Sequence, residues 1–174
     1  WIEPNGDLLF YISRTDSWGG NGRLLKLGRV RITLDPAPST DDFLQTLSLE
    51  DGTLKARCGE TDIRLWVDAN YPVIHAEIDG TTETTATAAI ELWRTGNESD
   101  TLLENQEAQI GWYHRNITSD EPAKLANIQG MADFERQDPL LHRSFGAVIK
   151  AADAQRIDDT SLRSPKSKKH RFDL

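Results

Sequence analysis

Apolar and polar residues alternate with a period of two along most of this 174-residue chain. In residues 28–34, for example, Val30, Ile32 and Leu34 are predicted to share one face, with basic residues and a threonine on the other. This period is typical of half-buried β-strands, because successive side chains of a strand point to opposite faces of its sheet. The other predicted strands are residues 7–13, the two arms of 43–58, then 62–67, 73–78, 84–93, 110–115 and 145–151.

Turn residues separate these predicted strands about once every dozen residues. Asp51-Gly52 lies between two β-rich runs and predicts a hairpin, because this dipeptide tolerates the positive φ that tight turns require. Asp79-Gly80 predicts a second turn, between the strands 73–78 and 84–93. The residues predicted to face the core are Leu54, Ala56 and Cys58, then Ile63, Leu65 and Val67, then Ile74, Ala76 and Ile78, and finally Ala86, Ala88, Ile90 and Leu92.

Short strands with turns between them predict an all-β fold, an antiparallel sandwich or barrel, rather than repeated strand–helix–strand units. One short helix is expected in residues 119–131, within a long connection. Its predicted signals are a cap at Ser119, Pro122 near the first turn and Gly130 at the end. We expect residues 1–174 to form a single β-sandwich domain. Because Arg171 to Leu174 reads as the start of a strand, we expect the domain to be a fragment of a larger protein.

Composition limits the classes of partner. The net charge of −8 argues against a nucleic-acid partner. No apolar run approaches the roughly 20 residues that cross a bilayer, so no membrane partner is expected. The single cysteine, Cys58, excludes an internal disulfide framework, and the chain is long enough to bury a core without one.

The glycine-rich stretch within residues 14–32 raises the question of a phosphate site. A dinucleotide-binding loop requires glycines in the spacing G-x-G-x-x-G, between a strand and a helix. Gly19, Gly20 and Gly22 do not have that spacing, and the residues after them read as a strand. Asn21-Gly22 is a favoured turn dipeptide, so the simpler interpretation is a connection between two strands.

No catalytic residue, metal ligand or cofactor is predicted. None of the four histidines lies at a spacing typical of zinc ligands. Cys58 falls on the inward face of a predicted strand, where a buried thiol is inert. The 28 acidic residues contain many conceivable acid/base pairs, but their order in the chain assigns none of them.

Two tryptophans are predicted opposite the apolar face of their strands. Trp66 lies beside Arg64, and Trp93 lies beside Glu91. Their rings could stack on sugars, or they could form a second buried interface. The interface is the favoured interpretation, because large aromatic side chains usually become buried.

Several strings resemble the bacterial domain-of-unknown-function family 5703, along nearly the whole chain from Asn5 to about Ser164. They are NGDLLFYISRTDSW, NGRLLKLGRVRITLDP, LWVDANYPVIHAEI, AAIELWR, WYHRN and DPLLHRSFGAVIK. The family in turn is similar to the N-terminal β-super-sandwich domain that precedes the α/α-barrel in glycoside hydrolase family 95-like proteins. The resemblance implies an antiparallel β-super-sandwich in an exported bacterial protein whose catalytic carboxylates belong to the barrel. The family has no established catalytic motif to transfer to this chain.

These arguments together predict a non-catalytic N-terminal domain that packs on a downstream helical barrel and shapes its carbohydrate site. The alternatives are an autonomous carbohydrate-binding module, or a structural or protein-interaction sandwich without glycan affinity. The expected location is extracellular or periplasmic, and the isolated chain is expected to self-associate. If the domain binds carbohydrate itself, the candidate residues are Arg14, Asp16, Trp18 and Asn21, which are predicted to lie in a loop after the strand 7–13. A sugar ring stacks on an indole while its hydroxyls bond to the polar groups. The favoured alternative is structural: Trp18 plugs the end of the sandwich, and Asp16 caps a turn.

Overall fold

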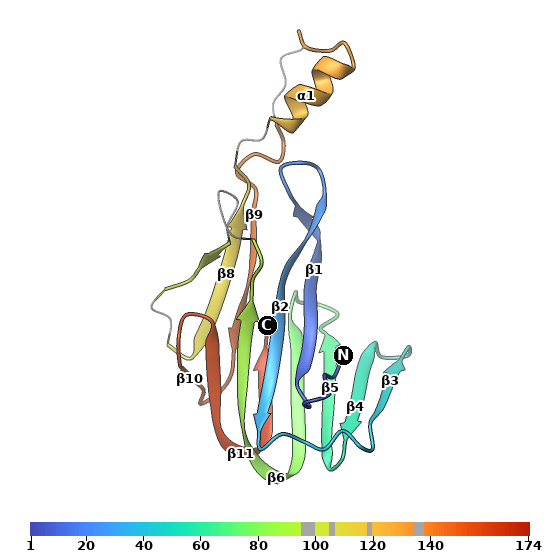
Figure 1. Ribbon diagram of the computed structural model, residues 1–174, viewed down its shortest axis with the longest axis vertical. Helices are drawn as coiled ribbons and strands as arrows, with labels where there is room; N and C mark the ends of the chain where they lie inside the picture. Colours follow the sequence, from blue (N-terminus) through green and yellow to red (C-terminus); the bar gives the residue numbers. More distant parts are fainter. Residues whose placement is uncertain (95–99, 105–106, 118–119, 134–137) are drawn as a thin grey trace.

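The computed structural model describes residues 1–94, 100–104, 107–117, 120–133 and 138–174. It confirms an all-β antiparallel fold with one short helix in the connection between the eighth and ninth strands (Figure 1). The strands are β1 (Leu8–Trp18), β2 (Leu24–Asp35), β3 (Leu44–Ser48), β4 (Thr53–Cys58), β5 (Thr61–Val67), β6 (Ile74–Glu91), β7 (Thr101–Leu102), β8 (Gln109–Arg115), β9 (Ser144–Lys150), β10 (Gln155–Arg156) and β11 (Ser161–Asp173).

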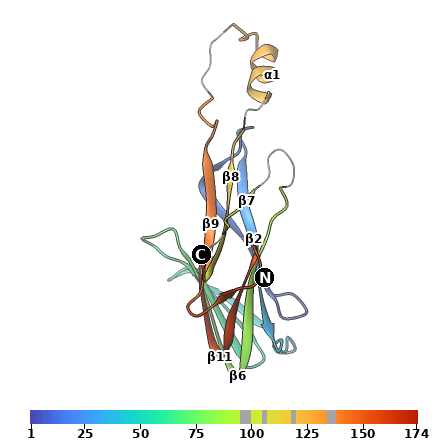
Figure 2. The same ribbon diagram turned by 90° about the vertical axis from the view of Figure 1, so that its left-hand side faces the viewer.

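The strands form two layers that share β6 and β11. The first layer has the strand order β3-β4-β5-β6-β11-β9-β8-β7. In the second layer, β2 pairs with β1 and with the other half of β6, and β10 pairs with the other half of β11. Residues 74–80 of β6 pair with β5, whereas residues 85–91 pair with β2. Figure 2 shows the layers meeting at β6 and β11 and separating towards the opposite end.

The prediction of a turn between two strands at Asp79-Gly80 is wrong. β6 continues through both residues, and its two halves pair with β5 and β2 instead of with each other. Figure 1 shows β6 bending at the lower end of the molecule, next to β11. Because β11 pairs with β6 on both sides of the bend, the strand can change layers without losing its neighbour.

One apolar core fills the space between the layers. The alternation predicted most of it: Ala56, Ile63, Ile78 and Ala88 are buried as expected. Val67 is the exception, since it is 66% exposed at the end of β5, where the layers have separated. The largest fully buried side chains include Trp112, Phe172, Leu27, Ile32, Ile63, Ile110, Ile149 and Leu162.

The local turn and helix predictions are largely confirmed. Ser48 pairs with Thr53 across a four-residue turn, and Gly52 has a φ of +66° there. The helix α1 (Glu121–Ile128) has Pro in its first turn, as predicted. Its N-cap residue is Asp120, whereas the predicted cap Ser119 lies outside the described residues. Within the described ranges, no helix is long and apolar enough to cross a membrane.

Candidate functional site

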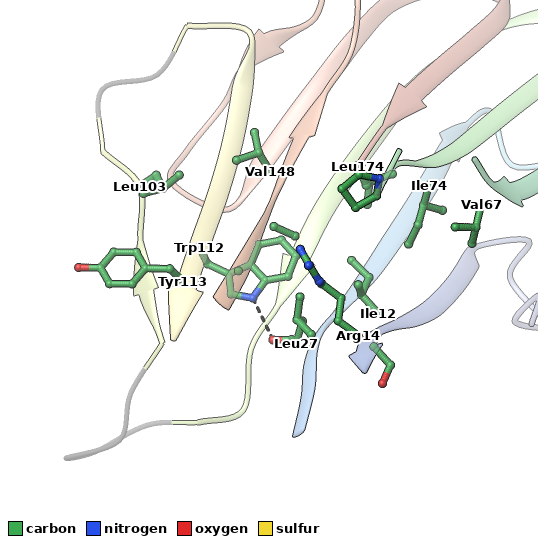
Figure 3. A pocket seen from close by; sticks show the side chains of 14 residues that line it. Ile12, Arg14, Leu27, Val67, Ile74, Leu103, Trp112, Tyr113, Val148 and Leu174 are labelled. Atoms are coloured by element: carbon green, nitrogen blue, oxygen red, sulfur yellow. Dashed lines mark hydrogen bonds between the residues drawn. The ribbon is translucent and has the colours of Figure 1, made fainter. Parts of the chain in front are cut away.

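An apolar cavity of about 520 Å³ lies where the two layers separate (Figure 3). We call it the interlayer cavity. Its volume falls within the range of about 300–1,000 Å³ that is common for binding pockets. The lining residues are Ile12, Ser13, Arg14, Leu27, Val67, Pro72, Ile74, Leu103, Trp112, Tyr113, Gly146, Ala147, Val148 and Leu174.

The cavity lies beside the junction of β9 and β11, which Figures 1 and 2 both show. Asp173 pairs with Lys150 at this junction. The main chain of Leu174 exchanges two hydrogen bonds of 2.8 Å with Ile74. On its other side β9 pairs with β8, from Gln109–Lys150 to Arg115–Ser144.

Trp112 connects the layers at the cavity wall. Its indole Nε1 donates a 2.9 Å hydrogen bond to the main-chain oxygen of Leu27, drawn as a dashed line in Figure 3. Gly28 permits this approach, because a Cβ atom there would lie 2.7 Å from the Trp112 ring. β2 is irregular at this point: Ile12 pairs with Gly28 and the next pair is Ser13 with Lys26. The irregularity leaves Leu27 outside the ladder and free to accept the indole proton.

Two further side chains bind main-chain oxygens across the same junction. Arg94 donates to the oxygens of Lys26 and Leu27, both at 2.7 Å. Asn116 donates to the oxygen of Trp18 at 2.8 Å and to that of Leu140 at 2.9 Å. We call Arg94, Trp112 and Asn116 the polar clasp. Two of its members, Arg94 and Trp112, satisfy the Leu27 carbonyl, which the irregular pairing of β1 and β2 leaves outside the ladder.

A buried histidine supports the polar clasp. His114 Nδ1 lies 3.2 Å from Asp100, and Nε2 lies 3.2 Å from the side-chain oxygen of Asn116. The imidazole stacks on Phe145, with ring centroids 5.0 Å apart. Asp100 also receives a 2.8 Å hydrogen bond from Arg94. Because both ring nitrogens have partners, this Asp–His pair is a structural group that orients Asn116.

The lining of the interlayer cavity is mainly apolar. Among the described residues that line it, none has a carboxylate, imidazole or thiol side chain. Arg14, a charged residue of the lining, forms two 3.0 Å hydrogen bonds with Asp16. Among the described residues, no group of three or more potential ligands could hold a metal ion.

The structure places the predicted sugar residues at the end of β1 and in the following turn. Arg14, Asp16 and Trp18 belong to β1, so their predicted position in a loop is wrong. β1 extends further than its alternation indicated because β2 pairs with it again at Trp18–Leu24 beyond the irregular segment. Asn21 lies in the turn and accepts a hydrogen bond from the main chain of Arg23. Of these candidates only Arg14 lines the cavity.

The two candidate interface tryptophans lie in different layers. Trp66 is half-buried on β5 and contacts His75, with ring centroids 4.9 Å apart and ring planes tilted by 32°. Trp93 lies two residues after the end of β6, not inside a strand, and is 46% exposed. The ring centroids of Trp93 and of Tyr11 in β1 lie 5.7 Å apart. The sequence did not reveal Tyr11 as its neighbour, because 81 positions separate them in the chain.

Ion pairs cover the outer face of the first layer and shift several pKa values. Hydrogen bonds from Arg57 lower the pKa of Asp62. Backbone hydrogen bonds from Asn70 and Tyr71 lower the pKa of Asp68. Asp62 is exposed and Asp68 is partly exposed, so each interaction stabilises the fold only slightly.

The fold and the cavity define a two-layered β-sandwich with a cavity between its layers. The chain belongs to the DUF5703 N-terminal family, described as a domain of unknown function, whose family model matches residues 1–107. No curated protein matches the chain.

Proposed function

We propose that this chain is the non-catalytic N-terminal domain of an exported glycoside-hydrolase-like protein. In this proposal it packs against a helical-barrel domain of the same protein and shapes the carbohydrate site of that barrel. The glycoside hydrolase and the export are what the family's similarity to the N-terminal domain of glycoside hydrolase family 95-like proteins implies, and strings such as LWVDANYPVIHAEI carry the resemblance to the family itself. An autonomous carbohydrate-binding module and a purely structural sandwich are the alternative functions.

The observation that carries the docking role is the interlayer cavity beside the junction of β9 and β11. The cavity opens to solvent, so its apolar lining stays in contact with water, and a partner that covered this lining would gain hydrophobic stabilisation. An apolar segment of the adjoining domain that entered the cavity would bury this surface.

A second surface supports the same role. Four exposed apolar side chains lie on and around β3, the edge strand of the first layer: Phe43, Leu44, Leu47 and Leu49. We call them the apolar edge. Exposed apolar side chains gathered at the edge of a sheet favour contact with another surface.

Hydrogen exchange provides the test, using the isolated chain and the longer natural protein that contains it. We expect the amides of residues 144–149 and of β3 to exchange more slowly in the longer protein. Equal exchange in both proteins at both places would contradict the docking role.

A cavity-filling variant makes the test specific. Ala147 lines the cavity on β9, so Ala147→Leu should fill part of it and raise the Tm of the isolated chain. In the longer protein the same variant should lower the Tm, because the leucine competes with the docked segment. Ala123→Leu on the exposed side of α1 is the matched control and should change neither Tm. An equal rise of Tm in both proteins would show that the cavity is empty in the longer protein.

A further inference from the structure

Three exposed aromatic side chains form a continuous row on the outer side of the second layer. Trp1, Tyr11 and Trp93 are 48%, 46% and 46% exposed. The ring centroids of Trp1 and Tyr11 lie 5.6 Å apart, and those of Tyr11 and Trp93 lie 5.7 Å apart. We call these three residues the aromatic row. It goes beyond the docking role, since none of its members lines the interlayer cavity.

Polar groups lie directly beside the rings. Glu3 accepts a 2.6 Å hydrogen bond from the Trp1 indole. The Arg29 guanidinium lies 5.8 Å from the centre of the Tyr11 ring, and that of Arg94 lies 5.4 Å from the Trp93 ring. The row therefore combines apolar ring faces with a carboxylate, a phenol hydroxyl and a guanidinium.

The charges beside the row are balanced. Arg29 pairs with Glu91, and Arg94 pairs with Asp100 at 2.8 Å. Arg31, next to Arg29 on the outward face of β2, pairs with both Asp7 and Glu91. A row flanked by neutralised cations offers a polyanion little net attraction, so the charge pattern favours an uncharged ligand.

The surroundings of the row also argue against a protein partner. Across the outer face, Tyr11 pairs with Arg29, which in turn pairs with Glu91. Both neighbours are charged, so the described residues that lie level with Tyr11 on β2 and β6 add no apolar surface to the row. A stable protein interface needs about 1,000 Å² of buried area with an apolar centre, which three rings do not supply.

We propose that the aromatic row is a binding site for an uncharged oligosaccharide. The apolar C–H face of a pyranose stacks on an aromatic ring, and its hydroxyls donate to Glu3 or accept from Tyr11 and Arg29. The distance between neighbouring ring centroids is comparable to the length of one sugar unit in an extended glycan. Because the planes of neighbouring rings differ by 41° and 73°, the row fits a twisted soluble chain and not a flat crystalline surface.

Affinity electrophoresis of the complete chain tests this site. The gels would contain mixed-linkage β-glucan, galactomannan or arabinoxylan as uncharged probes, and alginate as the charged comparison. At least one uncharged polysaccharide should retard the chain, and alginate should not. The proposal would be overturned if no uncharged polysaccharide retarded the chain. It would also be overturned if alginate alone retarded it, or if the chain bound only crystalline cellulose.

Variants locate the binding. Tyr11→Ala and Trp93→Ala should each raise the Kd about ten-fold, which corresponds to about 1.4 kcal/mol. Tyr11→Phe keeps the ring and should retain most of the affinity. Tyr71→Ala removes an exposed tyrosine outside the row and is the matched control. The inference would be refuted if Tyr71→Ala weakened binding as much as the row variants do. It would also be refuted if Tyr11→Ala and Trp93→Ala kept full affinity and an unchanged circular dichroism spectrum, because the glycan would then bind elsewhere.

Discussion

The indole nitrogen of Trp112 in β8 binds the main-chain oxygen of Leu27 in β2, at 2.9 Å and across the junction of the two layers. The same oxygen also accepts a hydrogen bond from Arg94. The layers are thus joined by hydrogen bonds from side chains to the main chain, at the end where they do not share strands. This junction borders the cavity to which we assign the docking role.

Replacing Trp112 tests the contribution of that hydrogen bond. Trp112→Phe should lower the free energy of unfolding by about 1–3 kcal/mol, because it removes a buried donor and some packing volume. Urea denaturation of the variant and the wild type measures the difference. Trp18→Phe, at a partly exposed position, is the control and should stay within about 0.5 kcal/mol of wild type. A larger loss for the control than for Trp112→Phe would contradict this account.

Gly28 and Trp112 should be energetically coupled. The Cβ of Gly28→Ala would approach the indole to 2.7 Å, so the substitution should cost about 1–3 kcal/mol. The three nearest atoms all belong to the indole, and a phenyl ring lacks its second ring. Gly28→Ala should therefore cost less in a Trp112→Phe background. A double-mutant cycle in urea measures this, and strictly additive losses would exclude the contact as the cause.

Substitutions of Asn116 and Trp18, which meet at the junction of the layers, should differ in their effect on stability. Asn116 is buried and holds two main-chain oxygens, so Asn116→Ala should cost about 1–3 kcal/mol. The bond uses the carbonyl of Trp18 and not its indole, which is 39% exposed. Trp18→Ala should therefore change the unfolding midpoint much less. If Trp18→Ala proved the more damaging, the indole would be the structural element.

Stability should fall in mild acid because of His170. Burial lowers the pKa of its imidazole below the ordinary 6.5, and Nε2 lies 3.0 Å from the Thr84 hydroxyl. As the pH falls below 6.5, the unfolded state takes up a proton that the folded state does not, so the free energy of unfolding decreases. The slope from this group is at most about 1.4 kcal/mol per pH unit.

The matched variant for that prediction is His170→Gln, which keeps a hydrogen-bonding side chain and cannot titrate. The stability difference between wild type and variant should shrink or reverse between about pH 7.5 and pH 5.5. Taking the difference removes the contribution of nearby carboxylates such as Glu77 and Asp79. A difference that does not change with pH would show that His170 does not titrate differently in the two states.

The apolar edge should cause self-association of the isolated chain. Leu47 is exposed on β3, and Leu54 of β4 is its partner across the ladder. We expect sedimentation velocity to show reversible association at high concentration. Leu47→Lys should reduce it, because a charge on an edge strand opposes pairing with another chain. A wild-type chain that remains monomeric at high concentration would contradict this prediction.

The sequence by itself determined the strands, because their signals are local. The alternation at Val30, Ile32 and Leu34 reports which side of the strand is buried, and that requires no knowledge of its partner. The hairpin at Asp51-Gly52 follows from turn chemistry for the same reason. Asp79-Gly80 carries a similar local signal, but β11 runs along both halves of β6 and converts the expected turn into a bend.

Tertiary structure alone decided the places where function is proposed. The cavity is lined by residues of β1, β2, β5, β6, β8 and β9, and no short stretch of sequence encodes their meeting. Trp93 becomes the neighbour of Tyr11 only after β1, β2 and β6 have assembled. Contacts between residues far apart in the chain depend on strand order and register. Periodicity gives the faces of each strand, and packing decides which of those faces meet.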